Sequence, residues 1–191
     1  MQPIDFFAKP ITTKLTWNDL DLPKDTLSQI HEIEKWIKYS DSLLENSGLR
    51  NKIKPGHRAL FYGPPGTGKT ITAALLGKYN DKDVYSIDLS LVVSKYIGET
   101  EKNLATLFDK AENGDWILFF DEADALFGKR TNISDANDRY ANQATSYLMQ
   151  RMELYKGLII LATSAKDSID EKFIRRLNTV IYFPDTNSEE K

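Results

Sequence analysis

An eight-residue, glycine-rich loop constrains this chain more than any other feature. It reads Gly63-Pro64-Pro65-Gly66-Thr67-Gly68-Lys69-Thr70 and fits the pattern G-x-x-x-x-G-K-[ST] in full. An apolar run, Ala59–Tyr62, precedes it, and a helix-forming stretch, Lys69–Tyr79, follows it. A glycine-rich turn that merely starts a helix is the alternative, but strand, loop and helix signals rarely coincide by chance. The sequence therefore predicts a phosphate-binding loop.

The loop has a definite chemistry. Glycines let the backbone turn tightly, so that its N–H groups converge on phosphate oxygens. The N-terminus of the next helix adds a partial positive charge. We expect Lys69 to reach the β- and γ-phosphates and the Thr70 hydroxyl to bind Mg²⁺. The predicted cofactors are ATP and Mg²⁺, and the predicted nucleotide-binding residues are Gly63, Pro64, Pro65, Gly66, Thr67, Gly68, Lys69, Thr70 and Ile71.

Two carboxylates, Asp121 and Glu122, directly follow the apolar run Ile117–Phe120. Charges that follow a buried strand lie at the carboxyl edge of the sheet, where the phosphate loop also opens. We predict that Asp121 holds Mg²⁺ through water and that Glu122 orients and polarises the attacking water. The alternative is an acidic loop exposed to solvent. We consider it the weaker interpretation because a phosphate loop lies upstream.

Residues 121–124 also spell Asp-Glu-Ala-Asp, which suggests a DEAD-box RNA helicase. Such helicases close two similar domains around ATP and RNA, whereas 191 residues leave room for only one. The net charge of −3 also argues against a large RNA-binding surface. We therefore reject the helicase interpretation.

Strand and helix signals alternate along the chain. Apolar runs predict further strands at Val84–Asp88, Ile117–Phe120, Leu158–Thr163 and Val180–Phe183. Helical spacing predicts further helices at Lys24–Tyr39, Thr100–Glu112 and Ala136–Glu153. Continuously apolar strands that alternate with helices indicate an α/β fold with a mostly parallel sheet covered on both faces.

The composition excludes several classes of protein. There is no cysteine, so disulfides and thiol catalysis are excluded. No apolar run reaches the roughly 18–20 residues that a membrane span needs, and Met1–Pro10 contains no apolar signal core. We therefore expect a cytoplasmic protein without membrane contact. Both histidines, His31 and His57, are expected at the surface rather than in a zinc site.

Four blocks of sequence together resemble the ATPase domain of the AAA family, from about Trp17 to Pro184. They are similar to the approach to that family's phosphate loop, its pore-loop segment, its acidic block and its arginine-finger block. In this chain they are, in order, Ile53–Gly56 leading into the phosphate loop, Ser94–Asn103, Asp121–Arg130, and Ile169-Asp170 with Phe173–Leu177.

The resemblance implies a P-loop NTPase three-layer sandwich. Its sheet would have five parallel strands, with the phosphate-loop strand near the middle. It also implies a homo-oligomeric ring, commonly hexameric, with ATP at the subunit interfaces. Residues 137–153 would lie near such an interface.

The resemblance also implies functional residues outside the nucleotide site. Arg176, with Arg175 as its partner, would act on ATP in a neighbouring subunit; surface arginines in salt bridges are the alternative. Tyr96, Ile97 and Gly98 would form a pore loop that grips a polypeptide, unless Tyr96 instead packs within its own subunit.

Two departures from the family pattern affect these expectations. The family's first sensor is usually Asn after Ala-Thr, whereas this chain has Ala162-Thr163-Ser164. Ser164 offers one hydroxyl in place of an amide, so it positions water more weakly unless Thr163 shares the role. The family's helical lid should begin near Ser188, so we expect the lid to be truncated here.

We therefore expect an irregular N-terminal arm (residues 1–16), a nucleotide-binding large subdomain (17–187) and the start of a truncated lid (188–191). The leading functional hypothesis is an ATP hydrolase that remodels or threads a protein partner as a ring. The alternative is an ATP-binding regulatory switch or scaffold with little turnover. A DNA-directed loader or helicase is disfavoured by the aromatic loop and by a pI of about 5.5.

Overall fold

A six-stranded sheet forms the centre of the molecule, with strand order β1-β3-β4-β5-β2-β6. The computed structural model describes residues 8–45, 56–89, 99–127 and 136–185. The strands are β1 (Ala8–Ile11), β2 (His57–Tyr62), β3 (Val84–Ile87), β4 (Ile117–Phe120), β5 (Leu158–Thr163) and β6 (Thr179–Tyr182). β1 runs antiparallel to β3, and all other pairings are parallel.

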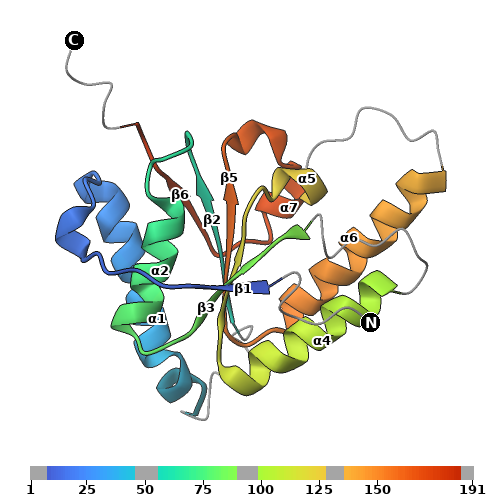
Figure 1. The fold of residues 1–191 in the computed structure, drawn as a ribbon, viewed down its shortest axis with the longest axis horizontal. Helices are drawn as coiled ribbons and strands as arrows, with labels where there is room; N and C mark the ends of the chain where they lie inside the picture. Colours follow the sequence, from blue (N-terminus) through green and yellow to red (C-terminus); the bar gives the residue numbers. More distant parts are fainter. Residues whose placement is uncertain (1–7, 46–55, 90–98, 128–135, 186–191) are drawn as a thin grey trace.

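Helices cover both faces of the sheet, which confirms the three-layer α/β sandwich. α1 (Lys24–Glu45) and α2 (Lys69–Tyr79) cover one face, and α4 (Glu99–Gly114) and α6 (Ala136–Leu154) cover the other (Figure 1). Shorter elements are α5 (Asp124–Phe127), α7 (Glu171–Ile174) and the 3₁₀ turns η2 (Trp17–Asp19) and η3 (Lys166–Ser168). None of the helices in these residues is long and apolar enough to cross a lipid bilayer.

The central strands β4 and β5 are buried along their whole length. Successive side chains point to opposite faces of the sheet. Phe119 accordingly packs in the core beneath α1 and α2, while Phe120 packs in the core beneath α4 and α6. Both faces need apolar residues, which explains why these strands are continuous apolar runs rather than alternating ones.

Two expectations about the sheet are wrong. The five parallel strands are joined by a sixth, β1, which lies within the stretch expected to be irregular. β1 has little apolar pattern and contains Pro10, which is tolerated because β1 is an edge strand. The phosphate-loop strand β2 is next to the edge strand β6 rather than near the middle. Strand order depends on long-range pairing, which no local pattern in the sequence encodes.

The parallel strands bring three loops to one edge. β2, β4 and β5 end at Tyr62, Phe120 and Thr163 on neighbouring positions of the sheet. Backbone hydrogen bonds continue beyond the strands: Gly63 N donates to Thr163 O at 3.2 Å, and Ala123 N donates to Ala162 O at 2.9 Å. The phosphate loop, the acidic strand end and the end of β5 are therefore held side by side.

His57 is half-buried, contrary to the expectation of a surface histidine. β2 begins two residues before the predicted strand, so His57 lies between α1 and β6. Its ring centroid is 5.2 Å from that of Trp36, and its Nε2 is 2.9 Å from Thr179 Oγ1. Burial, with a smaller contribution from the positive charge of Arg58, lowers the pKa of His57 to about 4.

We predict that His57 makes the fold sensitive to acid. Because its pKa is lower in the folded state, the unfolded chain takes up the proton first. The stabilisation by the neutral ring is present above pH 6.5 and is lost as the pH falls toward about 4. The total loss is about 3 kcal/mol of unfolding free energy. Urea denaturation at pH 7 and pH 4.5 should show a smaller pH effect in His57→Asn than in the wild type.

His31→Asn is the matched control, because the side chain of His31 is 52% exposed. It should keep the pH dependence of the wild type. An equal loss of stability on acidification in His57→Asn and the wild type would contradict the assignment to His57.

Candidate functional site

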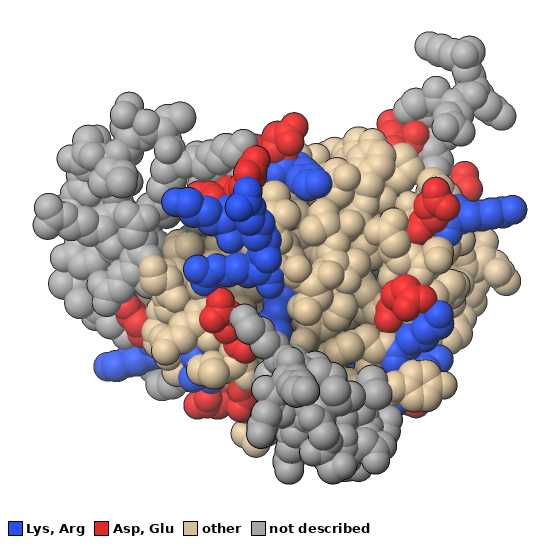
Figure 2. Space-filling model, turned by 180° about the vertical axis from the view of Figure 1, so that it is seen from behind, with Lys and Arg blue, Asp and Glu red and all other residues tan. Residues whose placement is uncertain are grey.

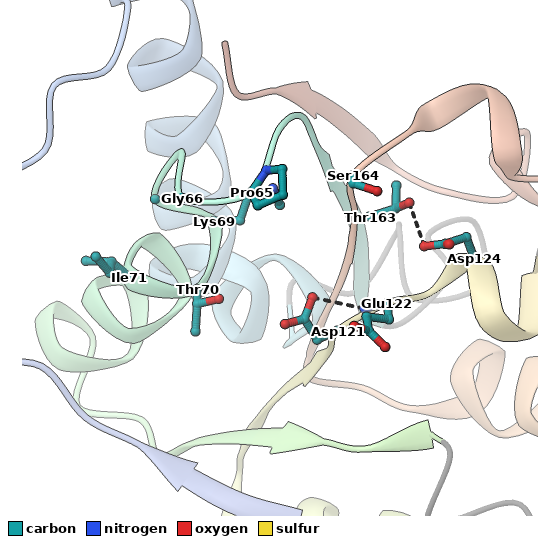
Figure 3. Close-up of a pocket in the computed structure, with 11 residues that line it drawn as sticks. Pro65, Gly66, Lys69, Thr70, Ile71, Asp121, Glu122, Asp124, Thr163 and Ser164 are labelled. Atoms are coloured by element: carbon teal, nitrogen blue, oxygen red, sulfur yellow. Dashed lines mark hydrogen bonds between the residues drawn. The ribbon is translucent and has the colours of Figure 1, made fainter. Parts of the chain in front are cut away.

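A cavity of about 550 Å³ opens at the carboxyl edge of the sheet, beside the phosphate loop (Figure 3). Its walls come from the phosphate loop with the start of α2, from the acidic end of β4, and from the end of β5. The lining residues are Pro65, Gly66, Gly68, Lys69, Thr70, Ile71, Asp121, Glu122, Asp124, Thr163 and Ser164. The structure thus brings together residues that the sequence places about a hundred positions apart.

The backbone of the phosphate loop leaves N–H groups free for an anion. Gly68 adopts φ +92° directly before α2 and provides no side-chain cap for the helix. The first N–H groups of α2 therefore lack a side-chain acceptor at the end that faces the cavity. At the other end of the loop, a Cβ on Gly63 would lie 2.0 Å from the carbonyl oxygen of Phe183, so only glycine fits beside this residue, which directly follows β6.

Lys69 lies folded back onto its own loop. Its Nζ donates to Gly63 O at 2.6 Å and to Pro64 O at 2.8 Å, and Thr67 Oγ1 also donates to Pro64 O at 2.8 Å. Burial lowers the pKa of Lys69, and the negative charge of Asp121 opposes this shift. Phosphate oxygens would be better acceptors than these neutral carbonyls, because charge-assisted hydrogen bonds are stronger. Gly63, Pro64 and Thr67 thus shape the loop without lining the cavity.

Thr70 and Asp121 present oxygen atoms to the cavity. Figure 3 shows the Thr70 hydroxyl and the Asp121 carboxylate facing one another, with Glu122 on the far side of Asp121. A hydroxyl and a carboxylate are the hard oxygen ligands that Mg²⁺ prefers, so these residues fit that ion. Within the described residues, no group of three or more His, Cys, Asp or Glu could hold a metal. Water and phosphate oxygens would therefore complete its coordination.

The backbone of Glu122 is strained. Its φ is +50°, a left-handed conformation that is uncommon for residues other than glycine. Its N–H donates to Asp121 Oδ1 at 2.9 Å, which orients the aspartate while fixing the turn. Strain of this kind persists only where surrounding structure holds it, and it is frequent at functional sites.

The end of β5 contributes Thr163 and Ser164, the two residues considered as first sensor. Thr163 is buried, and its Oγ1 donates to Asp124 Oδ1 at 2.8 Å, whereas the exposed Ser164 side chain lines the cavity. Sequence reasoning assigned no role to Asp124, although it belongs to the acidic block. Its position after an apolar strand, at the ligand-binding edge of the sheet, is the signal that could have identified it.

The two candidate arginines lie outside the cavity. Arg175 and Arg176 follow α7, with both side chains more than half exposed. Arg175 Nη2 is 3.5 Å from Glu171 Oε2, and Arg176 Nη1 donates to Glu153 Oε1 at 3.0 Å. Neither arginine is among the residues that line the cavity.

Several predicted features lie outside the described residues. These are the pore loop with Tyr96, Ile97 and Gly98, the end of the acidic block at residues 128–130, and the start of the lid at 188–191.

The sequence of this chain matches a known protein family. The ATPase family associated with various cellular activities (AAA) matches residues 59–185. The chain is 32% identical over 174 residues to the cell division cycle protein 48 homolog of Archaeoglobus fulgidus, covering 88% of this chain and 23% of that protein. It is 33% identical over 150 residues to the 26S proteasome regulatory subunit 10B homolog A of Arabidopsis thaliana, covering 75% of this chain and 38% of that protein. The chain thus spans less than half the length of these relatives.

A solved structure supports the fold. The crystal structure of the FIGL-1 AAA domain in complex with ADP matches with a TM-score of 0.69 at 22% sequence identity. The match covers 93% of this chain and 58% of that chain.

We predict that Lys69→Ala weakens the binding of MgATP about tenfold to hundredfold. The substitution removes a charge-assisted phosphate contact of about 1.5–3 kcal/mol. Titration calorimetry with a slowly hydrolysed ATP analogue measures the effect. Lys78→Ala, on the same helix but bonded to the Leu15 carbonyl, is the matched control and should bind as the wild type does. Unchanged affinity in Lys69→Ala would contradict the assignment of the loop.

Proposed function

This chain belongs to the AAA family of ATPases, and from that premise we propose that it binds MgATP and hydrolyses it in a ring of like subunits to remodel or thread a protein partner. The observation that carries the proposal is the single cavity in which the phosphate loop, the acidic pair and the end of β5 meet. Phosphoryl transfer needs these parts together, because its catalysis is almost entirely positioning and electrostatic stabilisation.

Each wall of the cavity has a part in this reaction. The N–H groups of the loop and the start of α2 bind the phosphates, and Lys69 exchanges the carbonyls of Gly63 and Pro64 for phosphate oxygens. Thr70 and Asp121 would hold Mg²⁺, which would supply positive charge to offset the negative charge of the phosphates. Glu122 orients the attacking water and accepts its proton, and Ser164 hydrogen-bonds that water from the β5 side.

We predict that Glu122→Gln keeps nucleotide affinity and lowers kcat about 10²- to 10⁴-fold, the usual contribution of a general base. The amide keeps the shape of the side chain but cannot accept the proton. Steady-state phosphate release and calorimetric affinity should be measured on the same preparation. Glu112→Gln, an exposed glutamate on α4, is the control and should leave both quantities unchanged. Hydrolysis by Glu122→Gln at the wild-type rate would remove Glu122 from the proposed mechanism.

The exposed arginines support an assembled active site. A guanidinium is permanently charged and forms a planar fork suited to γ-phosphate oxygens. Because Arg175 and Arg176 do not line their own cavity, they would serve the nucleotide of a neighbouring subunit. Arg176, which donates to the carboxylate of Glu153, would exchange that carboxylate for phosphate on assembly.

We predict that Arg176→Ala lowers kcat about 10³- to 10⁵-fold in the assembled protein, as for arginine fingers generally. Mixing Arg176→Ala subunits with Lys69→Ala subunits should restore part of the activity, because some interfaces then pair an intact loop with an intact arginine. The wild-type rate per subunit should also rise with protein concentration. A monomer, verified by sedimentation, whose activity does not depend on concentration would contradict this prediction.

The partner is proposed to be a polypeptide. On the side opposite to Figure 1, basic side chains gather in one row with acidic ones around them, rather than in a broad basic surface (Figure 2). Such a row offers little for an extended nucleic-acid backbone. Tyr96 and its neighbours Ile97 and Gly98 would contact the polypeptide by stacking and apolar contact, which suit many peptide sequences.

A regulatory switch with little turnover is the second candidate. The presence of Ser164 where the family usually has Asn favours it, since a hydroxyl positions water less firmly than an amide does. Ser164→Asn distinguishes the two candidates: a large rise in kcat would support the switch, and little change would support the hydrolase.

A further inference from the structure

The turn that carries Glu122 is bordered by a partly buried side-chain hydrogen bond. Thr163 is 2% exposed, and its Oγ1 donates to Asp124 Oδ1 at 2.8 Å (Figure 3). Thr163 Oγ1 also accepts a hydrogen bond from Ala165 N at 3.2 Å. The other possible acceptor for its hydroxyl proton, Ala165 O, is farther away at 3.4 Å. The single hydroxyl proton is therefore directed to Asp124.

Thr163 also connects the turn to the phosphate loop. Its backbone carbonyl accepts a hydrogen bond from Gly63 N, the first residue of that loop, at 3.2 Å. One residue of β5 thus binds the phosphate loop through its backbone and the acidic segment through its side chain. Any displacement of Thr163 would move both walls of the cavity.

Asp124 is held at its other end as well. It opens α5, whose last residue, Phe127, stacks on Phe173 of α7 with ring centroids 3.9 Å apart and planes 4° from parallel. The Phe127 carbonyl accepts from Asp170 N at 2.9 Å. With α5 anchored to α7, the bond to Thr163 fixes the beginning of α5 against the sheet.

The strained backbone of Glu122 lies between these fixed points. Before Glu122, Asp121 directly follows strand β4. After Glu122, the backbone N–H of Ala123 donates to the carbonyl oxygen of Ala162 at 2.9 Å. A left-handed glutamate relaxes unless its neighbours prevent it. We propose that Asp124 and Thr163 form a clasp that holds Glu122 in its working conformation, which makes both of them positioning residues for hydrolysis. This inference rests on the proposed function, and it leaves Ser164 as the residue of this strand end that faces water.

The test compares Thr163→Val, Asp124→Ala and the double variant. Each should lower kcat about 10- to 100-fold, because a displacement of about 1 Å at a catalytic group costs up to about 100-fold in rate. KM for ATP and the calorimetric Kd for MgADP should stay within about threefold, since the phosphate contacts remain. The double variant should be no slower than the slower single variant, because both changes break one bond. Thr163→Ser keeps the hydroxyl and should recover most of kcat.

Thr26→Val is the matched control. Thr26 is 5% exposed, and its Oγ1 donates to Tyr182 O at 3.0 Å, so the same substitution removes a comparable, partly buried bond between α1 and β6, outside the nucleotide cavity. It should lower the melting temperature about as much as Thr163→Val while leaving kcat unchanged.

Hydrogen exchange makes the result independent of catalysis. The Ala123 amide should exchange at least about tenfold faster in Thr163→Val than in the wild type, and at the wild-type rate in Thr26→Val. If the wild type binds MgATP but never hydrolyses it, the proposed function is wrong. The exchange rate of the Ala123 amide would still test whether Asp124 and Thr163 hold the Glu122 turn. An unchanged Ala123 exchange rate in Thr163→Val, or a kcat within twofold of the wild type in an active protein, overturns the proposal.

Discussion

The parallel pairing of β2, β4 and β5 is the constraint on which the rest of this structure depends. Because parallel strands end at the same edge, the residues after Tyr62, Phe120 and Thr163 must meet there, whatever their separation in the sequence. The pairing requires strands that are buried on both faces, and β4 and β5 meet this requirement with apolar residues at every position but the last of β5. That last residue, Thr163, is polar because it belongs to the site as well as to the sheet.

A second fixed point lies at the opposite end of β2. Arg58 is only 6% exposed, and its guanidinium donates to the carbonyl oxygens of Met152, Glu153 and Tyr155 at 2.6–3.1 Å. A buried charge is costly alone, but here it meets the unsatisfied carbonyls and the partial negative charge at the C-terminus of α6. The end of α6 is thus fixed to β2, and Glu153 is placed where its carboxylate accepts from Arg176.

The sequence was most informative where chemistry is local. The bounds of α2, β4 and β5 were predicted correctly, because a glycine loop, an acidic pair and continuous apolar runs mark them. The cavity residues of the loop and the acidic pair followed from the same signals, whereas Thr163 and Ser164 were named only through the family resemblance and Asp124 was missed. The strand β1 and the order of the sheet could not be predicted, since Ala8–Ile11 has little apolar pattern and pairs with β3, which lies far away in the sequence. The half-buried His57 was missed for a similar reason: α1 and β6 cover it, and neither is near it in the chain.

The role of Asp124 shows where local reasoning ends within the site itself. A motif identifies Asp121 and Glu122 by their place after a strand, but it does not show which partner each acidic residue meets. Thr163 lies 39 positions after Asp124 in the chain, and the β4–β5 pairing brings its hydroxyl to the Asp124 carboxylate. Ser164, directly after Thr163, therefore stands at a strand end that is joined to the acidic segment by the Thr163–Asp124 bond. Since that bond occupies the Thr163 proton, Ser164 is the residue of this strand end whose hydroxyl is exposed at the cavity.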